Sequence, residues 1–385
     1  MKNIPYGKQH ITNEDLQAVE NVLLSDFLTQ GPTVELFEKK IAEYCNVKYA
    51  VAVSNATAAL HISCLALGLA PGDVIATSPN TFVASSNCAL YCGASVEFID
   101  IELATYNISI QNLITKLESG FRPKIVIPVH FAGASCDMEK LFELKKKYGF
   151  QIIEDASHAV GATYRDQKVG SCQFSDICVF SFHPVKIITT GEGGIITTNN
   201  FDTYKKLILL RSHGITRDPN LMLEKPHGAW FYSQISLGFN YRLTDIQAAL
   251  GLSQMNRLNE YVNSRNKLAS TYGRKIKDRK IDITVPFVQE NRISSWHLYV
   301  ILLNDERNIE NKNKIFEYLK SKGIGVNIHY IPVPSQHYYT QLGYKTDGIP
   351  QAMIYYKRAL TLPLFPMMTE EDIDYILNQL EESLQ

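Results

Sequence analysis

Several features that mark other classes of protein are absent from this chain of 385 residues. No apolar segment reaches the roughly 20 residues that a membrane-spanning helix needs, and the first residues contain no apolar signal-peptide core. The 38 lysines and arginines nearly balance the 39 aspartates and glutamates, so a net charge of −1 gives no general attraction to nucleic acid or membrane surfaces. We therefore expect a globular cytoplasmic protein without nucleic-acid or membrane partners.

Paired cysteines are also missing. The seven cysteines are odd in number, are scattered, and include no CxxC pair. This pattern indicates neither a disulfide framework nor a zinc site, so no bound metal is predicted. Most of the cysteines are interpreted as small core residues in a reducing compartment.

What the chain does contain is a regular alternation of short apolar runs and helical stretches, up to about residue 200. Seven runs are predicted to be strands, at residues 49–53, 74–77, 96–100, 124–129, 151–154, 177–181 and 194–198. Most of them contain a continuous apolar run, as expected for strands that are buried on both faces. The alternation predicts an α/β fold with a mostly parallel seven-stranded sheet and helices on both of its faces.

Helical patterns flank this region. A helix is predicted over 13–25, where Thr12 and Asp15 have the spacing of a capping box, and a second helix is predicted to open at Thr33. After residue 244 a long helical pattern runs to about residue 272, and it is followed by expected strands at 296–303 and 325–329 and helices at 311–321 and 369–383. This change in the pattern of predicted helices and strands predicts an N-terminal arm and large domain at 1–255 and a smaller α+β domain at 256–385.

The segment between the sixth and seventh predicted strands contains a candidate for covalent catalysis. It runs from Ser181 through His183 and Lys186 to a glycine-rich turn at 191–194. A lysine between two core strands is partly desolvated, which lowers its pKa from about 10.4 and frees its lone pair to attack a carbonyl. The alternative is a surface-loop lysine beside a turn, and this segment alone does not decide between the two.

An acidic residue upstream favours the first interpretation. Residues 151–159 are predicted to form a buried strand that ends at Asp155, with His158 just beyond it. Ligands of α/β sheets bind at the carboxyl ends of strands, where a carboxylate can keep the pyridine nitrogen of pyridoxal phosphate (PLP) protonated. The order Asp155, Ser181, Lys186 is the one that a fold type I PLP enzyme needs. Asp155 could instead cap a helix, although its place after an apolar run favours the cofactor role.

Other positions have two interpretations each. The turn at 54–57 joins a strand to a helix start, whose free N–H groups can bind a phosphate, or it is an ordinary cap. Phe82 could stack on a pyridine ring or belong to the core. His158 could contact the cofactor or satisfy a core hydrogen bond, and His183 could move a proton or only pack.

Together these motifs resemble those of the DegT/StrS family of sugar-nucleotide aminotransferases. The resemblance extends from 28–32 to 362–366, and its specific parts are residues 54–57, 154–161, 181–186, 192–194 and 240–245. It implies a fold type I PLP-dependent homodimer, with a large and a small domain and with active sites at the subunit interface. Related dehydratases have histidine in place of the lysine; because Lys186 is present, the resemblance implies amino transfer.

The family's functional residues carry over onto matching positions. Lys186 would hold PLP covalently, Asp155 would pair with the pyridine nitrogen, and Phe82 would stack on the ring. The other cofactor positions are His158 beside the ring and Ala56, Thr57 and Ser181 at the phosphate. Asn240 would reach the phosphate from the partner subunit. Nucleotide-sugar contacts are expected from loops that vary with the sugar: Tyr6, Asp26, Phe27, Leu28, Thr29, His183, Arg242, His329, Tyr330, Ile331 and Pro332.

Within the family, the amino-acid sequence at 26–32, 180–190 and 250–254 is most similar to that of transaminases that make UDP-4-amino-4,6-dideoxy-N-acetyl-β-L-altrosamine in pseudaminic acid biosynthesis. The reaction implied is transfer of the amino group of L-glutamate to C4 of a UDP-4-keto-6-deoxy-N-acetylhexosamine. The aminotransferase for UDP-4-amino-arabinose has a similar loop at 181–186, so that loop does not decide between the sugars.

Two other classes of protein compete with this interpretation. A Rossmann-type oxidoreductase would suit the α/β half, but no GxGxxG motif follows the first predicted strand. A non-catalytic binding protein of the same fold would not need both Lys186 and Asp155.

Overall fold

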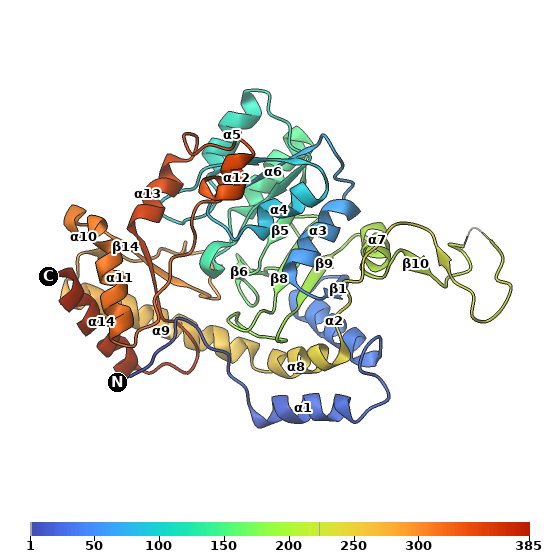
Figure 1. The fold of residues 1–385 in the computed structure, drawn as a ribbon, viewed down its shortest axis with the longest axis horizontal. Coiled ribbons are helices and arrows are strands. Elements are labelled where there is room, and N and C mark those ends of the chain that lie inside the picture. The colour runs from blue at the N-terminus through green and yellow to red at the C-terminus, as the bar shows by residue number, and fades with distance from the viewer. Residues whose placement is uncertain (1, 223) are drawn as a thin grey trace.

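The computed structural model describes residues 2–222 and 224–385, and a seven-stranded sheet lies at its centre (Figure 1). The strands are β1 (Tyr49–Val53), β2 (Val74–Thr77), β3 (Ser95–Phe98), β4 (Ile125–Ile127), β5 (Gln151–Asp155), β8 (Ile177–Ser181) and β9 (Gly194–Thr198). Their order is β1-β9-β8-β5-β4-β2-β3, and only β9 runs against the others. The predicted mostly parallel sheet is confirmed.

Helices cover both faces of this sheet because alternate residues of each strand point to opposite sides. In β8, Ile177 and Val179 pack into one apolar cluster, whereas Cys178 and Phe180 pack into another. The first face carries α3 (Ala56–Ala66), α4 (Ala84–Tyr91) and α7 (Phe201–Arg211), and the second carries α2 (Pro32–Cys45), α5 (Ile110–Glu118), α6 (Met138–Tyr148) and α8 (Asp245–Met255). The core thus has three layers, with the sheet buried in the middle.

The N-terminal helices follow the expected caps. Helix α1 (Asn13–Leu23) begins after Thr12, and the predicted capping box with Asp15 is present. Helix α2 begins at Pro32, one residue before the predicted Thr33, with Gly31 as its cap. In Figure 1 α1 runs beside α8, which it also contacts closely.

The single long helix predicted after residue 244 is wrong. Helix α8 ends at Met255 and α9 (Leu258–Arg279) begins after a break at residues 256–257. At the break, Arg257 donates to the buried carboxylate of Asp15 at 2.6 Å and to the hydroxyl of Tyr261 at 2.9 Å. The contact with Asp15 of α1 is tertiary, so the helical pattern of the sequence does not contain it.

A second core lies in the C-terminal part, at the left of Figure 1. Strands β12 (Ile283–Thr284), β14 (Tyr299–Leu303) and β15 (Ala359–Leu362) form an antiparallel sheet. Helices α9, α11 (Lys312–Ser321) and α14 (Glu370–Leu384) pack on it, and α10 (Glu306–Glu310) lies nearby. Ile4 of the N-terminal segment joins this core and pairs with Ile324.

One strand prediction in this part begins too early, and another is wrong. β14 begins at Tyr299 rather than at residue 296, because Trp296 has a positive φ of 50° and turns the chain before the strand. Residues 325–329 form no strand; they contribute a single bridge from Asn327 to Thr361, and the Asn327 side chain accepts from Ile328 N at 2.8 Å. This local hydrogen bond uses the backbone N–H of Ile328, which would otherwise be available for pairing with a neighbouring strand.

Smaller elements complete the chain. A three-stranded sheet joins β6 (Thr163–Tyr164), β7 (Gln167–Lys168) and β13 (Arg292–Ile293), and η1 (Phe131–Gly133) and η2 (Val333–Ser335) are short 3₁₀ turns. Helices α12 (His337–Gln341) and α13 (Pro350–Arg358) pack back on the large sheet through Tyr339 and Tyr355. The domain division at 255/256 coincides with the α8–α9 break and stays a prediction.

The hairpin of β10 (Ile215–Thr216) and β11 (Ser233–Gln234) projects from the body at the right of Figure 1. It exposes large apolar side chains, including Trp230 (72% exposed) and Leu237 (79%). No helix in the described part of the chain is both long and apolar enough to span a membrane. All seven cysteines are free and buried.

Candidate active site

A cavity of about 650 Å³ opens at the carboxyl ends of β5 and β8. The predicted site residues that line it are Tyr6, Ala56, Thr57, Phe82, Asp155, His158, Ser181, His183, Lys186, His329 and Tyr330. They come from segments that span almost the whole chain, so the fold brings together residues that the local motifs and the family resemblance indicate. A hollow of similar size, about 700 Å³, lies elsewhere around the Glu38–Arg211 ion pair and contains none of the predicted catalytic groups.

The remaining predicted positions do not line the cavity within one chain. They are Asp26, Phe27, Leu28, Thr29, Asn240, Arg242, Ile331 and Pro332. Asn240 is exposed and Arg242 lines the other hollow. Thr29 pairs with Thr244, so the loop at 26–29 meets the segment that contains Asn240 and Arg242.

Lys186 lies in a tight loop between β8 and β9. Its backbone N–H donates to the carbonyl of His183 at 2.9 Å, and Thr190 N–H closes the loop on Phe182 O at 3.0 Å. Burial lowers the pKa of Lys186 from 10.5 to about 8, and the nearby Asp155 carboxylate opposes this shift. The amine therefore has an accessible neutral form near pH 8, which a freely solvated lysine lacks.

Asp155 is the last residue of β5, and no helix begins there in the described residues, so its alternative role as a helix cap is excluded. Its Oδ2 accepts from Ser85 Oγ at 2.5 Å, and its Oδ1 accepts from Ser157 Oγ at 2.6 Å and from Ser157 N at 3.1 Å. Donors thus hold both oxygens in place. A carboxylate in this position can pair with a protonated ring nitrogen.

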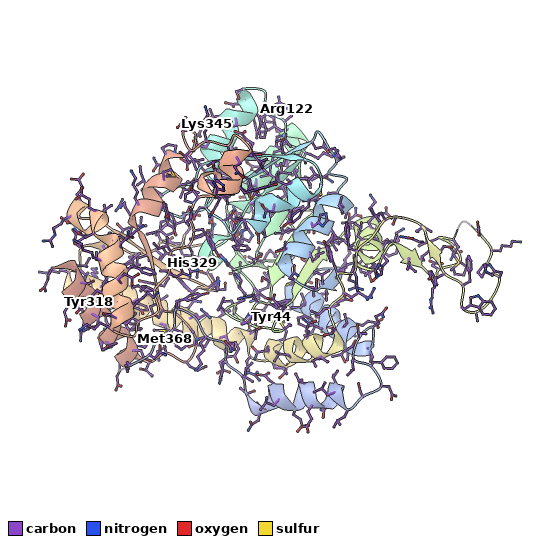
Figure 2. The ribbon with its side chains drawn as sticks, viewed as in Figure 1. Tyr44, Arg122, Tyr318, His329, Lys345 and Met368 are labelled. Carbon is purple, nitrogen blue, oxygen red and sulfur yellow. The ribbon has the colours of Figure 1, made fainter. Side chains whose placement is uncertain are left out.

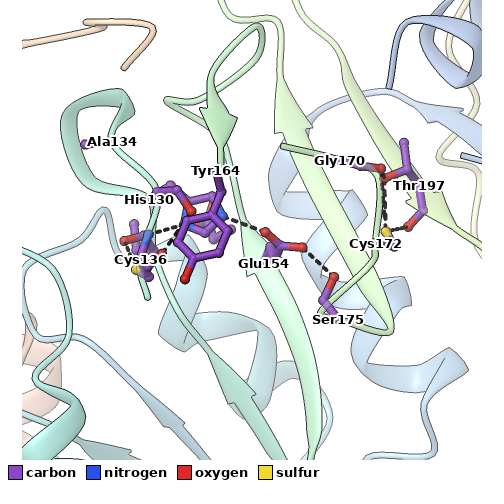
Figure 3. A network of polar contacts seen from close by, with 12 residues as sticks. His130, Ala134, Cys136, Glu154, Tyr164, Gly170, Cys172, Ser175 and Thr197 are labelled. Carbon is purple, nitrogen blue, oxygen red and sulfur yellow. Dashed lines mark hydrogen bonds and ion pairs between the residues drawn. The ribbon is translucent and has the colours of Figure 1, made fainter. Parts of the chain in front are cut away.

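Glu154, one residue earlier, points to the other face of the strand and holds β5 in place (Figure 3). Its carboxylate meets His130 Nε2 at 2.7 Å and also accepts from Ser175 Oγ. Because Cys136 N–H donates to His130 Nδ1 at 3.2 Å, we assign the ring proton to Nε2, which donates to Glu154. This network fixes the strand end from which Asp155 projects.

Free N–H groups at the start of α3 could hold a phosphate. The cap residue Asn55 accepts from Ala58 N at 2.8 Å, which leaves the N–H groups of Ala56 and Thr57 for a ligand. Because Gly194 has no side chain, β9 can lie close to the start of α3; a Cβ at this position would lie 2.7 Å from Ala56 N. Ser181 pairs with Gly194 across the strands and adds a hydroxyl at the cavity wall.

Aromatic rings and imidazoles form the rest of the wall. Phe82 is 59% exposed and lies 6.2 Å from the Tyr330 ring, so it faces the opening and is not a core residue. His158 is buried; its Nδ1 accepts from Ala132 N at 3.3 Å and its Nε2 meets Tyr330 Oη at 3.1 Å. His158 therefore makes core hydrogen bonds and lines the cavity as well.

His329 lies in the interior of the molecule, as Figure 2 shows. Its Nδ1 meets Thr361 Oγ1 at 2.9 Å. Burial lowers the pKa of His329 to about 3 and lowers the pKa of His158 well below 6.5. Both rings are neutral at pH 7, so they act as hydrogen-bonding surfaces.

The sequence reasoning missed His297. The structure places it against Lys186, with its Nε2 3.3 Å from the lysine Nζ. The local signal is weak: the sequence pattern predicts the start of a strand at residues 296–297, and a lone histidine there is most simply a core residue.

The cavity fits PLP part by part. Lysine can bind the cofactor's carbonyl, a carboxylate can pair with the ring nitrogen, free N–H groups with Ser181 suit a phosphate, and Phe82 offers a ring face at the opening. The buried Nδ1 of His297 has no partner among the described residues, as expected at the wall of a ligand site. These features define a pyridoxal-phosphate-dependent aminotransferase.

The chain belongs to the DegT/DnrJ/EryC1/StrS aminotransferase family, which matches residues 9–381. It is 37% identical to the UDP-4-amino-4,6-dideoxy-N-acetyl-β-L-altrosamine transaminase of Campylobacter jejuni, over 99% of this chain and 98% of the relative. It is also 37% identical to the spore coat polysaccharide biosynthesis protein SpsC of Bacillus subtilis, over 98% and 96%.

Solved structures agree with this membership. Helicobacter pylori PseC, an aminotransferase involved in the biosynthesis of pseudoaminic acid, matches with a TM-score of 0.91 and 33% identity over 99% of both chains. NtdA of Bacillus subtilis, with bound cofactor PMP, matches with a TM-score of 0.84 and 30% identity, over 97% of this chain and 83% of that one. The protein is a sugar aminotransferase that uses PLP.

Proposed function

We propose that this enzyme transfers the amino group of L-glutamate to C4 of a UDP-4-keto-6-deoxy-N-acetylhexosamine and so makes UDP-4-amino-4,6-dideoxy-N-acetyl-β-L-altrosamine. The observation that carries the reaction type is the placement of Lys186 and Asp155 in one cavity at the strand ends. The sugar is supported by the two Campylobacter jejuni transaminases, 37% and 36% identical over 99% of the chain, whose names state this product.

In this proposal each part of the cavity holds one part of the cofactor. The α3 start with Ser181 would hold the phosphate, Asp155 the ring nitrogen, and Phe82 and His158 the two ring faces. When bound, PLP supplies a carbonyl that receives the amino group and a ring that accepts electrons from the neighbouring carbon. Asp155 would assist by keeping positive charge on the ring nitrogen, and the hydrogen bonds from Ser85 and Ser157 hold its carboxylate in place for this role.

Lys186 would act as the acid–base group. In the first half-reaction Nζ removes the proton from Cα of glutamate, and in the second it delivers a proton to C4 of the sugar. A pKa of about 8 suits both tasks, because a group that titrates near the working pH can be either base or acid. Tyr6 and His329 lie at the same cavity and would contact the sugar nucleotide.

The positions outside the cavity suggest that a second subunit completes it. We propose a homodimer in which Asn240 and Arg242 of one chain serve the site of the other. The segment at 240–242 directly follows the projecting hairpin, whose Trp230 and Leu237 are exposed in the single chain. Burial of those side chains in a dimer would stabilise the assembly through the hydrophobic effect.

The test is a two-step spectrum of the purified enzyme loaded with PLP. L-glutamate should convert the visible absorption of the bound cofactor, and UDP-4-keto-6-deoxy-L-AltNAc should restore it, with the aminated product identified by mass spectrometry. Restoration by UDP-4-keto-arabinose alone would keep the reaction and replace the sugar. If neither glutamate nor any 4-keto sugar changes the spectrum, the proposed activity is wrong.

A further inference from the structure

His297 is the nearest hydrogen-bonding neighbour that the structure gives to the Lys186 amine. The two nitrogens lie 3.3 Å apart. The imidazole is only 5% exposed and comes from the C-terminal half of the chain, whereas Lys186 belongs to the large sheet's β8–β9 loop. The contact therefore joins two parts of the fold at the reacting group.

The backbone around His297 is anchored independently of its ring. Arg265 of α9 donates through one nitrogen to Trp296 O at 3.0 Å and to Leu364 O at 2.8 Å. Ser295 Oγ donates to His158 O at 2.7 Å. Gly133 lets this loop lie against the large sheet, since a Cβ there would be 2.8 Å from Trp296 N. The imidazole is thus held at Lys186 by contacts that a substitution of the ring leaves in place.

Burial and the charges around the ring keep it neutral. Burial lowers the pKa of His297 well below 6.5, and the neighbouring Lys186, His158, Arg265 and His329 act in the same direction. The His158 ring is 4.5 Å away, and the carboxylate of Asp155 faces Lys186 from β5. A neutral imidazole beside a protonated lysine accepts one hydrogen bond at Nε2 and carries its own proton on Nδ1.

That Nδ1 atom is buried without a partner in the described residues. A buried polar atom left unpaired is unfavourable, and an apolar ring of similar size would avoid the penalty. A histidine at this position is therefore explained by what its other nitrogen does. Nε2 is the atom within reach of Lys186.

We propose that His297 is a positioning residue for Lys186: its Nε2 accepts a hydrogen bond from the lysine amine and holds Nζ aimed into the cavity. This inference rests on the proposed role of Lys186 in the reaction. Lysine has four flexible bonds, so an amine released between proton transfers would otherwise sample many directions. The imidazole restricts the amine to the direction from which Nζ can reach the reacting carbon.

The chain offers a matched pair of variants for a test. In His297→Gln the amide lies near the position of Nε2, whereas in His297→Asn it lies near that of Nδ1. Both variants remain polar, so they differ chiefly in whether an acceptor reaches Lys186. His297→Phe removes both nitrogens, and His337→Gln, at a histidine of α12 outside the cavity, is the control.

The first measurement uses protein without cofactor. Lys186 is labelled with trace acetic anhydride across pH 6 to 10, and its peptide is quantified by mass spectrometry, which gives the pH midpoint of the amine. The wild-type midpoint is expected near 8. Loss of the acceptor destabilises the ammonium form, so Asn and Phe should lower the midpoint by about one pH unit, whereas Gln and the control should not.

The second measurement uses the holoenzyme. Asn and Phe should reduce kcat by roughly 10- to 100-fold with little change in the KM for the sugar, because they disturb alignment and not binding. Gln should recover most of the loss. Equal labelling midpoints and equal kcat for Gln and Asn, in variants with normal thermal unfolding, would overturn the proposal.

The two proposals can fail separately. If Lys186→Ala still turns over at the wild-type rate, the catalytic role of Lys186 fails. The labelling midpoints need neither cofactor nor substrate, so they still report whether His297 holds the amine.

Discussion

Ser85 donates a hydrogen bond of 2.5 Å to the carboxylate of Asp155. The two hydroxyls of Ser85 and Thr81 lie 2.7 Å apart, so Thr81 can donate to Ser85 in turn. Ser85 belongs to α4 and Asp155 to β5, and both are buried. The helix therefore determines the direction in which the strand's carboxylate faces the cavity.

Ser85→Ala should weaken the enzyme through Asp155. A hydrogen bond to a charged group contributes about 1.5–3 kcal/mol, so we expect a loss of roughly 10- to 100-fold in kcat/KM and weaker PLP binding. Titration of the apoenzyme with PLP and steady-state kinetics measure the two effects. Ser63→Ala is a matched control in α3, because Ser63 Oγ is buried without a partner among the described residues. Equal affinity for PLP in both variants would contradict the role of Ser85.

Gly194→Ala should displace the start of α3. The added Cβ would lie 2.6 Å from the carbonyl carbon of Asn55 and 2.7 Å from Ala56 N, and neither backbone atom can move aside alone. Affinity for PLP, measured by fluorescence quenching, should fall at least about tenfold if these N–H groups bind the phosphate. Gly348→Ala adds a Cβ in open space and should leave the affinity unchanged.

Asp245→Ala should destabilise the fold more than its single carboxylate suggests. The buried Asp245 accepts from Gly31 N at 2.8 Å and from Thr33 N at 2.9 Å, so its loss leaves two backbone donors at the α2 start unpaired. We expect a loss of about 2–4 kcal/mol in the free energy of unfolding, measured with urea. Asp202→Ala, an exposed acidic residue in the first turn of α7, should change it by less than about 0.5 kcal/mol.

Lys186 should make the stability of the apoenzyme depend on pH. Its pKa is about 8 in the folded protein, whereas its ordinary value in a solvated chain is 10.5. Between these values the unfolded chain binds more protons than the folded chain, so the free energy of unfolding rises with pH. Below pH 8 the buried ammonium group lowers the free energy of unfolding by its full amount, about 3 kcal/mol.

Urea unfolding of apo wild type and Lys186→Met, from pH 7 to pH 10, tests this expectation. The wild type should gain stability relative to the variant as the pH rises above 8. Parallel stability curves across that range would show that the lysine amine is not desolvated.

Features that depend on local chemistry could be predicted from the sequence. The capping box of Thr12 and Asp15 and the seven apolar strands are present because caps and buried strands are specified by nearby residues. The helix break at Arg257 was missed because it involves a pairing with Asp15, more than 200 positions away.

The candidate site shows the same division. Lys186, Asp155 and the 54–57 turn stand in recognisable local motifs, and the structure brings all of them to one cavity. His297 has no such motif, since its place depends on how the C-terminal part packs against Gly133 and His158. Asn240 and Arg242 lie outside the cavity of their own chain, and their predicted roles stay predictions.

The burial of every cysteine gives the protein a built-in reporter. All seven thiols are free and buried in the folded chain, which shields them from reagents. Burial raises the pKa of Cys178 well above 9 and makes it a poor nucleophile, whereas a hydrogen bond with Cys64 lowers the pKa of Cys92 to about 6, so Cys92 is protected by burial alone. A thiol-reactive dye should therefore react with the native enzyme slowly and with the unfolded chain rapidly. Dye uptake can follow unfolding of any variant without a genetically attached tag. A single cysteine introduced on the surface would accept a fluorescent label selectively.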